Sequence, residues 1–309
     1  MNIVFMGTPD FAVPTLQKLY DNSHNVQAVF SQPDRPKGRG MKLTPPPVKV
    51  CATEHNTICY QPESLRKERD EYIPILKDLN PDVIVVVAFG QILTKEVLDI
   101  PKFGCINVHG SLLPKYRGAA PIQQSVLDGE KYSGVTTMLM GEGLDTGDML
   151  LKAEVEIGEN ETSSELYERL SYIGADLLIE TLEKLEKNEL TPIKQDESLA
   201  TYAGKLSKDL CPIDFSNSAQ EVHNQIRGLS DWPCATTTIN GKRLKVYRSQ
   251  IVMNDSDKKP GTVISKDLVV KCGSDSVKLV EIQAEGSKRM NSSDYLRGKP
   301  IEIGTVLGE

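Results

Sequence analysis

Two polar side chains, Asn107 and His109, stand at the end of a strand-like segment of the sequence. Successive side chains of a strand point to opposite faces, so these two share one face and Val108 takes the other. That face combines an amide, which donates hydrogen bonds, with an imidazole, which exchanges protons near neutral pH. The pair therefore predicts a site for acid–base chemistry.

A carboxylate is the expected third member of this site. Residues 141–148 place three acidic side chains in a glycine-rich loop, but their spacing lacks the order of a calcium-binding loop, so we expect no metal. Glycines let a chain double back, and Asp145 could then reach and orient His109. The alternative is an ordinary solvated aspartate in a turn.

Two other kinds of chemistry fit the motifs less well. Residues 7–11 stand where a Rossmann fold carries its glycine-rich turn, but they contain a single glycine and Pro9. We therefore expect helix initiation there and no nicotinamide cofactor. Ser111 lacks the G-x-S-x-G surroundings of a serine nucleophile, so the amide and imidazole remain the expected reacting pair.

Composition is that of an ordinary globular protein with two domains. The chain has 309 residues, 39% hydrophobic and 26% charged, where a domain typically takes about 150 residues. We expect no signal peptide, and no apolar run approaches the roughly 20 residues of a membrane span. The six cysteines are scattered without a C-x-x-C pair, so we expect neither disulfides nor zinc, and a cytoplasmic location is the default.

Charge is unevenly spread along the chain. The net charge is -7, yet residues 31–50 hold five Lys or Arg against one Asp, a local +4. Residues 206–309 hold 15 Lys or Arg against 13 Asp or Glu, a net +2. A polyanion could bind to these two segments even though the protein surface as a whole is not basic.

The first half alternates strand-like and helix-like segments. The short β-branched apolar runs are 3–6, 26–30, 83–87 and 105–108, and the helical patterns between them lie near 11–20, 69–79 and 120–128. Such alternation predicts a doubly wound, mostly parallel α/β sheet of the Rossmann-like kind. Ligands of these sheets bind at the carboxyl ends of strands, where segments ending at Gly7, Ala88 and His109 would meet.

The second half changes character. Residues 162–187 have helical spacing with a leucine-rich stripe that we expect to pack on the sheet, and periodicity is lost at 188–197. Short alternating runs follow at 235–239, 243–246, 262–264, 268–272 and 277–282, and Asn240-Gly241 is a strong hairpin signal. They predict a small OB-like β-barrel, a fold that often holds nucleic acid. The expected division is a catalytic domain over 1–188, a linker over 189–205 and a barrel domain over 206–309.

Several of these motifs occur together in one known family. They are Asn107, His109, residues 111–114, 117–118 and 121–122, and residues 143–148. In this combination the chain resembles the folate-dependent formyltransferases, and residues 7–11 and 32–40 look like the branch that acts on methionyl-tRNA. The likeness continues through 205–208 and 227–233, so it covers essentially the whole chain, although Ser230-Asp231-Trp232-Pro233 stands where the family usually shows Asn-Pro-Trp-Pro.

The resemblance implies an activity. A formyl group would pass from 10-formyltetrahydrofolate to the α-amine of methionine on initiator tRNA, without a metal. Negative charge grows on the formyl oxygen as the amine attacks, and donors placed there lower the barrier. Asn107 is implied to donate to that oxygen, and His109 to donate to it or to move the proton toward the folate nitrogen. Asp145 would hold His109, directly or through water.

The resemblance also implies two binding surfaces. The pterin ring would lie against three segments, namely Phe89, Gly90, Gln91, Ile92 and Leu93; Gly141, Gly143 and Leu144; and Ser111, Leu112, Leu113 and Pro114. The long basic loop 31–50 would enter the acceptor stem of the tRNA. Arg39 matches the key basic position of that loop, and Arg35, Lys37 and Lys42 would contact phosphates.

Two other classes of function stay open at this point. A formyltransferase acting on a sugar nucleotide, a purine precursor or another small amine would use the same three polar residues, but it needs neither the basic loop nor the barrel. A nonenzymatic tRNA-binding protein would need both, but it would leave Asn107, His109 and Asp145 without a purpose. Because two linked surfaces would hold one large substrate, we expect a monomer.

Overall fold

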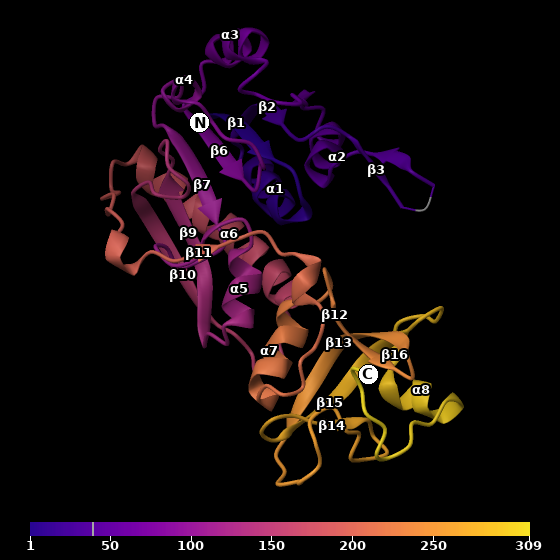
Figure 1. Cartoon of the computed structure of the whole chain (residues 1–309). Coiled ribbons are helices and arrows are strands. Elements are labelled where there is room, and N and C mark those ends of the chain that lie inside the picture. The colour runs from indigo at the N-terminus through magenta and orange to yellow at the C-terminus, as the bar shows by residue number, and fades with distance from the viewer. Residues whose placement is uncertain (39) are drawn as a thin grey trace. The chain divides into compact units, whose positions relative to one another are not determined.

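A seven-stranded sheet organises the first half of the chain (Figure 1). The computed structural model describes residues 1–38 and 40–309. In sheet order the strands are β10 (Met149–Glu156), β9 (Tyr132–Leu139), β7 (Cys105–His109), β6 (Val83–Val87), β1 (Asn2–Gly7), β2 (Asn25–Phe30) and β5 (Cys59–Tyr60). Neighbours from β7 to β5 pair in parallel, and β9 pairs with β7 antiparallel. The predicted doubly wound, mostly parallel sheet is confirmed.

Helices connect these strands, as the alternation of patterns predicts. They are η1 (Asp10–Ala12), α1 (Val13–Asp21), α2 (Pro47–Glu54), α3 (Arg69–Leu79), α4 (Lys95–Leu98) and α5 (Pro121–Leu127). Helices α1, α2 and α5 each carry a proline in the first turn, where the missing N–H costs no hydrogen bond. Strands β6 and β7 are buried along their full length, as expected for parallel strands that are covered on both faces.

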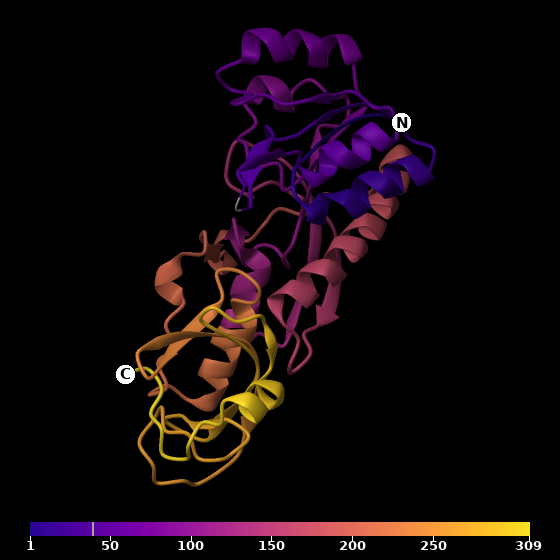
Figure 2. The same ribbon diagram turned by 90° about the vertical axis from the view of Figure 1, so that its right-hand side faces the viewer.

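The longest helix, α6 (Ser163–Glu186), fulfils the expectation for residues 162–187. Its fully buried leucines are Leu166, Leu170, Leu178 and Leu182. Gly174 lets the helix lie close to the sheet, because a Cβ at that position would stand 2.9 Å from a methyl group of Val108. The helix runs beside α1 (Figure 2), to which the Lys18–Asp176 ion pair joins it.

Several features of the first half differ from the sequence patterns, among them β5, α2 and α4, which those patterns do not indicate. The segment 31–50 is not a plain loop, because it contains a hairpin of β3 (Arg35–Lys37) and β4 (Lys42–Thr44) and the start of α2. The hairpin residues are all exposed, so no burial pattern marks them. The patterns also give no expectation of β9 or β10, although β10 alternates buried and exposed residues with the period of a strand.

The chain divides into two compact units. The first comprises Met1–Gly118, Gly134–Val155 and Tyr167–Tyr202, and the second comprises Ala119–Ser133, Glu156–Leu166 and Ala203–Glu309. The main sheet of the second unit has the order β12 (Ala235–Ile239), β13 (Lys242–Val252), β15 (Ser276–Ala284) and β14 (Val269–Lys271), with β16 (Met290–Asn291) also on β15. All of these pairs are antiparallel. A strand-rich second domain is confirmed, and barrel closure stays a prediction.

The hairpin signal in the second unit is also confirmed. Asn240 and Gly241 join β12 to β13 with φ of 50° and 71°, the left-handed values that a two-residue type I′ turn needs. The predicted strand at 262–264 is wrong: Thr262 bridges to Val306 and Val263 to Val270, so its partners change from one residue to the next and no ladder forms.

Two helices and several short elements complete the described chain. They are α7 (Ala219–Gly228), α8 (Ser292–Gly298), η2 (Glu197–Leu199), η3 (Lys208–Leu210), β8 (Arg117–Gly118) and β11 (Tyr202–Ala203), the last two forming a small sheet. Ser218 and Glu221 form a capping box at the start of α7, a motif that can be recognised in the sequence as S-x-x-E. No helix among the described residues is both long and apolar enough to span a membrane.

Candidate active site

The carboxyl ends of three parallel strands are tied together at the switch point of the first sheet. Chain order runs outward from β1 in both directions, with β2 on one side and β6 on the other. Just beyond β1, the Thr8 hydroxyl donates to the Phe89 carbonyl (3.0 Å) and accepts from the Gln32 N–H (3.2 Å). The predicted meeting of the ends of β1 and β6 is therefore confirmed, and β7, which pairs in parallel with β6, ends at the same edge of the sheet.

Asn107, His109 and Asp145 lie together at the end of β7. Asn107 is the last residue of β7 that pairs with β6, so His109 stands just past the parallel ladder. Asp145 approaches both side chains, with 3.5 Å from Asn107 Nδ2 to Oδ1 and 3.8 Å from His109 Nδ1 to Oδ2. Both distances are long for direct hydrogen bonds. The structure thus gathers the three predicted residues in one place, without a tight contact to Asp145.

The His109 ring is oriented by a backbone group. Its Nε2 lies 3.0 Å from the Tyr116 carbonyl oxygen. A carbonyl can only accept, so Nε2 carries a hydrogen and donates it. Nδ1 is therefore the ring position that can gain or lose a proton, and it faces the Asp145 carboxylate.

Asp145 is held in a strained but well-bonded turn. Its φ of 52° lies in the left-handed region, which a residue with a Cβ adopts at some cost. The Gly118 N–H donates to Oδ2 at 2.9 Å, and the Gln195 side chain donates to the Asp145 carbonyl at 2.7 Å. The glycine-rich loop does double back, and it delivers this carboxylate to β7.

Gly147 is the residue that makes the return of this loop possible. A Cβ at Gly147 would stand 1.6 Å from the backbone oxygen of Leu139, which is closer than atoms can approach. We expect Gly147→Ala to destabilise the protein by about 3 kcal/mol in chemical denaturation, because the backbone itself must move. Gly141→Ala is the matched control, since nothing lies within 4 Å of its added methyl group. Equal stability of the two variants would contradict this assignment.

The segment Ser111 to Pro114 forms a tightly bonded turn. Ser111 is buried, and its hydroxyl donates to the Lys115 carbonyl at 2.6 Å. Thr136 fixes the same turn, because its hydroxyl donates to the Ser111 carbonyl and accepts from the Leu113 N–H. Leu113 is in a core cluster with two methionines, whereas Leu112 and Pro114 are half-buried. The Ser111 hydroxyl therefore takes part in a hydrogen bond that stabilises the turn, which agrees with the expectation that Ser111 is not a nucleophile.

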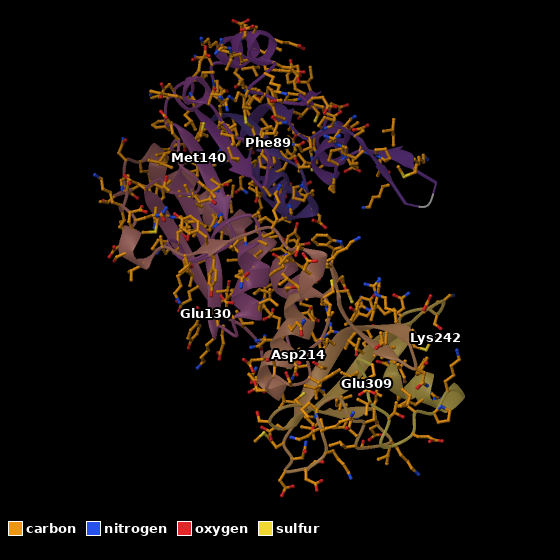
Figure 3. All side chains as sticks on the ribbon, in the orientation of Figure 1. Phe89, Glu130, Met140, Asp214, Lys242 and Glu309 are labelled. Carbon is orange, nitrogen blue, oxygen red and sulfur yellow. The ribbon has the colours of Figure 1, made fainter. Side chains whose placement is uncertain are left out.

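The segment Phe89 to Leu93 faces partly inward. Phe89 and Leu93 belong to a core cluster against which Met140 packs, and Figure 3 labels Phe89 and Met140. The Gln91 amide donates to the Pro62 carbonyl, and its oxygen accepts from the Leu65 N–H. The buried Phe89 and Leu93 side chains and the bonded Gln91 amide hold this segment in place.

Two predicted pterin contacts are exposed apolar side chains. Ile92 is 77% exposed and Leu144 is 62% exposed. The pKa of Lys95, at the start of α4, is raised chiefly by its hydrogen bond to Asp99, with a smaller contribution from the charge of Glu142. Gly90, with φ of 80°, precedes Ile92 by two residues, and Gly143 directly precedes Leu144. Such surface suits a flat heterocycle.

The hairpin β3–β4 carries Arg35, Lys37 and Lys42, whereas Lys49 of the same segment lies in α2 and forms an ion pair with Asp34. In Figure 1, β3 extends beyond α2. Lys37 and Lys42 are paired directly across the two strands, an arrangement of like charges that costs stability. Arg35 lies 3.4 Å from Glu63, whereas Arg39 lies outside the described residues. A hairpin that holds like charges side by side is suited to a polyanion.

Sequence reasoning misses two buried polar residues beside the site. Arg117 is completely buried and Gln195, which sits in the expected linker, is 9% exposed. A charged side chain is almost never fully buried without partners, so a buried arginine signals a specific network. In the described part of the chain, no three His, Cys, Asp or Glu side chains cluster as a metal site would require.

Comparison with known proteins assigns this arrangement to a class. Residues 1–182 match the sequence model of the formyl transferase family, and residues 205–300 match its model of the formyl transferase C-terminal domain. The chain thus carries both domains of a formyl transferase. Curated relatives named methionyl-tRNA formyltransferase match along the whole chain, and this chain belongs to the methionyl-tRNA formyltransferase family.

The relatives and the solved structures carry different weight. The relative from Clostridium novyi is 54% identical over 99% of this chain and 100% of its own length, and that from Clostridioides difficile is 52% identical over 100% of both. A sugar 3-N-formyl transferase crystallised with dTDP and 5-N-formyl-tetrahydrofolate has a TM-score of 0.68, at 21% identity over 93% of this chain and 99% of its own. HypX from Aquifex aeolicus, in complex with tetrahydrofolic acid, has a TM-score of 0.64, at 15% identity over 95% of this chain and 46% of its own. These two structures support the fold alone.

Proposed function

We propose that this chain transfers the formyl group of 10-formyltetrahydrofolate to the α-amine of methionyl initiator tRNA. The observation that carries the proposal is the likeness, at about half identity and over the whole chain, to relatives named methionyl-tRNA formyltransferase. A folate co-substrate is supported by the match to the formyl transferase family.

The chemistry proposed for the site needs three side-chain functions. The neutral amine attacks the formyl carbon, the carbonyl oxygen gains negative charge, and the bond to the folate nitrogen breaks as that nitrogen receives a proton. Asn107 donates a hydrogen bond to the charged oxygen. His109 relays the proton through Nδ1, and the Asp145 carboxylate, 3.8 Å away, stabilises the ring while it carries the extra charge.

The folate proposal assigns the predicted contacts to two kinds of surface. Ile92 and Leu144 would cover the faces of the pterin, since both are exposed apolar side chains. Backbone at Gly90, Gly141 and Gly143 would supply hydrogen bonds to the ring edge. Phe89, Gln91, Leu93 and the turn formed by Ser111, Leu112, Leu113 and Pro114 would support those surfaces from behind.

The tRNA proposal uses the hairpin of the first unit and the C-terminal unit. Arg35, Lys37, Arg39 and Lys42 would contact phosphates of the acceptor stem. The proposed division stays 1–188 for catalysis, 189–205 as a linker and 206–309 for further tRNA contacts. A monomeric state and a cytoplasmic location belong to the proposal, because one large substrate spans both surfaces and charged tRNA is used in the cytoplasm.

Arg39→Ala tests the tRNA assignment. We expect its formylation rate at subsaturating methionyl-tRNA to fall about tenfold, since a charge-assisted contact to phosphate is lost, with folate affinity unchanged. Initial rates at varied tRNA and salt concentration, together with folate titration, give both quantities. Arg69→Ala, which removes an exposed arginine from α3, is the matched control. A formylation rate of Arg39→Ala equal to that of the wild-type protein at low methionyl-tRNA concentration would contradict the assignment of Arg39 to tRNA binding.

The choice of amine is tested by offering the purified chain different acceptors. Methionyl initiator tRNA, uncharged tRNA and a nucleotide-linked amino sugar are each incubated with and without 10-formyltetrahydrofolate. We expect formyl transfer to methionyl-tRNA alone, and only with the folate. Transfer to the amino sugar would favour a small-amine formyltransferase, and tRNA binding without transfer to any acceptor would favour a nonenzymatic protein.

A further inference from the structure

A buried arginine joins the expected linker segment to the candidate site. The Arg117 guanidinium has no exposed surface and donates to both oxygens of Glu197, at 2.9 and 2.8 Å. Its Nε and Nη2 also donate to the side-chain oxygen of Gln195, at 3.0 and 2.9 Å. The hydrogen bond from Arg117 lowers the pKa of the Glu197 carboxyl, which therefore stays ionised as its partner. We call Arg117, Gln195 and Glu197 the brace.

Gln195 connects this hydrogen-bond network to the loop that carries Asp145. Its amide nitrogen donates to the Asp145 carbonyl at 2.7 Å and to the Gly147 carbonyl at 2.8 Å. With its oxygen fixed by Arg117, the amide can present only its two N–H groups to the loop. Both amide hydrogens and the amide oxygen are thus used, and the side chain has one orientation.

The same stretch of chain also fixes the other wall of the site. The Thr201 hydroxyl accepts from the Tyr116 N–H at 2.8 Å, and the Thr201 carbonyl accepts from the Arg117 N–H at 2.8 Å. Tyr116 in turn holds the His109 ring through its carbonyl, and Gly118 holds the Asp145 carboxylate through its N–H. Residues 195–201 therefore contact the supports of both His109 and Asp145.

We infer that Gln195 is a positioning residue for formyl transfer, which acts through the backbone of Asp145 and is itself locked by Arg117 and Glu197. Its role is to set the separation between the Asp145 carboxylate and His109 Nδ1, so that the imidazole is stabilised when it takes up the proton. None of the brace residues touches the reacting atoms in this account. The inference rests on the proposed function, because it assumes that Asp145 and His109 serve the transfer step.

Gln195→Glu is the sharpest test of the brace. The carboxylate keeps an acceptor for Arg117 but turns a second oxygen toward the carbonyls of Asp145 and Gly147, where a donor is required. A displacement of the loop by about 1 Å commonly costs on the order of tenfold to a hundredfold in rate. We expect a loss of that size in the single-turnover formylation of methionyl-tRNA, with the folate dissociation constant unchanged within about threefold.

Two further variants separate positioning from general damage. Glu197→Gln keeps one acceptor for Arg117 on an exposed side chain, and we expect a loss of about threefold without a change in folate binding. Asp196→Asn is the matched control, because the Asp196 carboxylate accepts only from Ser198 among the bonds described here. It should stay within about twofold of wild type.

Each outcome of these measurements either supports or overturns the proposed role of Gln195. A slower transfer step with intact folate binding in Gln195→Glu, and Asp196→Asn at the wild-type rate, supports the brace. A wild-type transfer rate in Gln195→Glu overturns the proposal. It is also overturned if folate affinity in Gln195→Glu and the transfer rate of Asp196→Asn fall as much as the transfer rate of Gln195→Glu. If Gln195→Glu does not fold, Glu197→Gln decides by the same criteria. Wild-type protein that does not formylate methionyl-tRNA would instead refute the proposed function, and the same assay reports this directly.

Discussion

Asn107→Ala is expected to lower the single-turnover rate of formyl transfer by on the order of a hundredfold or more. Asn107 sits at the last paired position of β7, where the sheet fixes its backbone before the oxygen of the formyl group gains charge. A donor that is already in place needs no reorganisation in the transition state, so its removal commonly costs this much. Folate and tRNA affinities should stay close to wild type, because the hydrogen bond strengthens only as charge develops.

A second substitution at the same position sharpens this result. Asn107→Asp keeps the size of the side chain but replaces the donor by acceptor oxygens, beside an Asp145 oxygen that is 3.5 Å from Nδ2 in the wild-type protein. Its rate should be at least as low as that of Asn107→Ala. Asn25→Ala, on the exposed start of β2, is the control. Rates of both Asn107 variants within about threefold of wild type would remove this residue from the mechanism.

His109→Gln is expected to lower the same rate by on the order of a hundredfold, as loss of a positioned acid or base commonly does. Glutamine can still donate to the Tyr116 carbonyl in place of Nε2, so the packing of the turn is largely retained. It cannot take up a proton where Nδ1 faces Asp145. The variant therefore tests proton transfer separately from orientation.

The measurement for His109→Gln is the single-turnover rate at saturating folate and tRNA. His24→Gln, at the turn after α1, is the matched histidine control and should match wild type. Thermal unfolding of both variants shows whether the fold is retained. A His109→Gln rate close to that of His24→Gln would show that proton transfer does not pass through this ring.

Sequence periodicity could predict the features that lie within one element. Strands β1, β2, β6 and β7, helix α6 and the Asn240-Gly241 turn follow from residue patterns of local range, whereas those patterns do not indicate β5, β9 or β10. Asn107 and His109 share a face for the same reason, because a strand repeats every two residues. Local pattern was therefore enough to place these two side chains together.

What periodicity could not supply are contacts between distant segments. Arg117 and Gln195 are 78 residues apart, and Gln195 lies in a polar stretch whose lack of pattern suggests a passive linker. The hairpin β3–β4 is exposed throughout, so burial leaves no mark on its sequence. The glycines of the 141–148 loop indicate that it doubles back, but the hydrogen bond from Gln195 to the Asp145 carbonyl joins residues 50 positions apart and leaves no local pattern.

We propose that this chain moves a formyl group from a folate to the amine of methionyl-tRNA at Asn107, His109 and Asp145. The most direct test follows isotope-labelled formyl from 10-formyltetrahydrofolate under single-turnover conditions, with purified full-length wild type beside Asn107→Ala. We expect the label to appear on the methionine amine of the tRNA, at a rate on the order of a hundredfold lower in Asn107→Ala than in the wild-type protein. Unlabelled methionyl-tRNA with the wild-type protein, or equal rates for the two proteins, would contradict it.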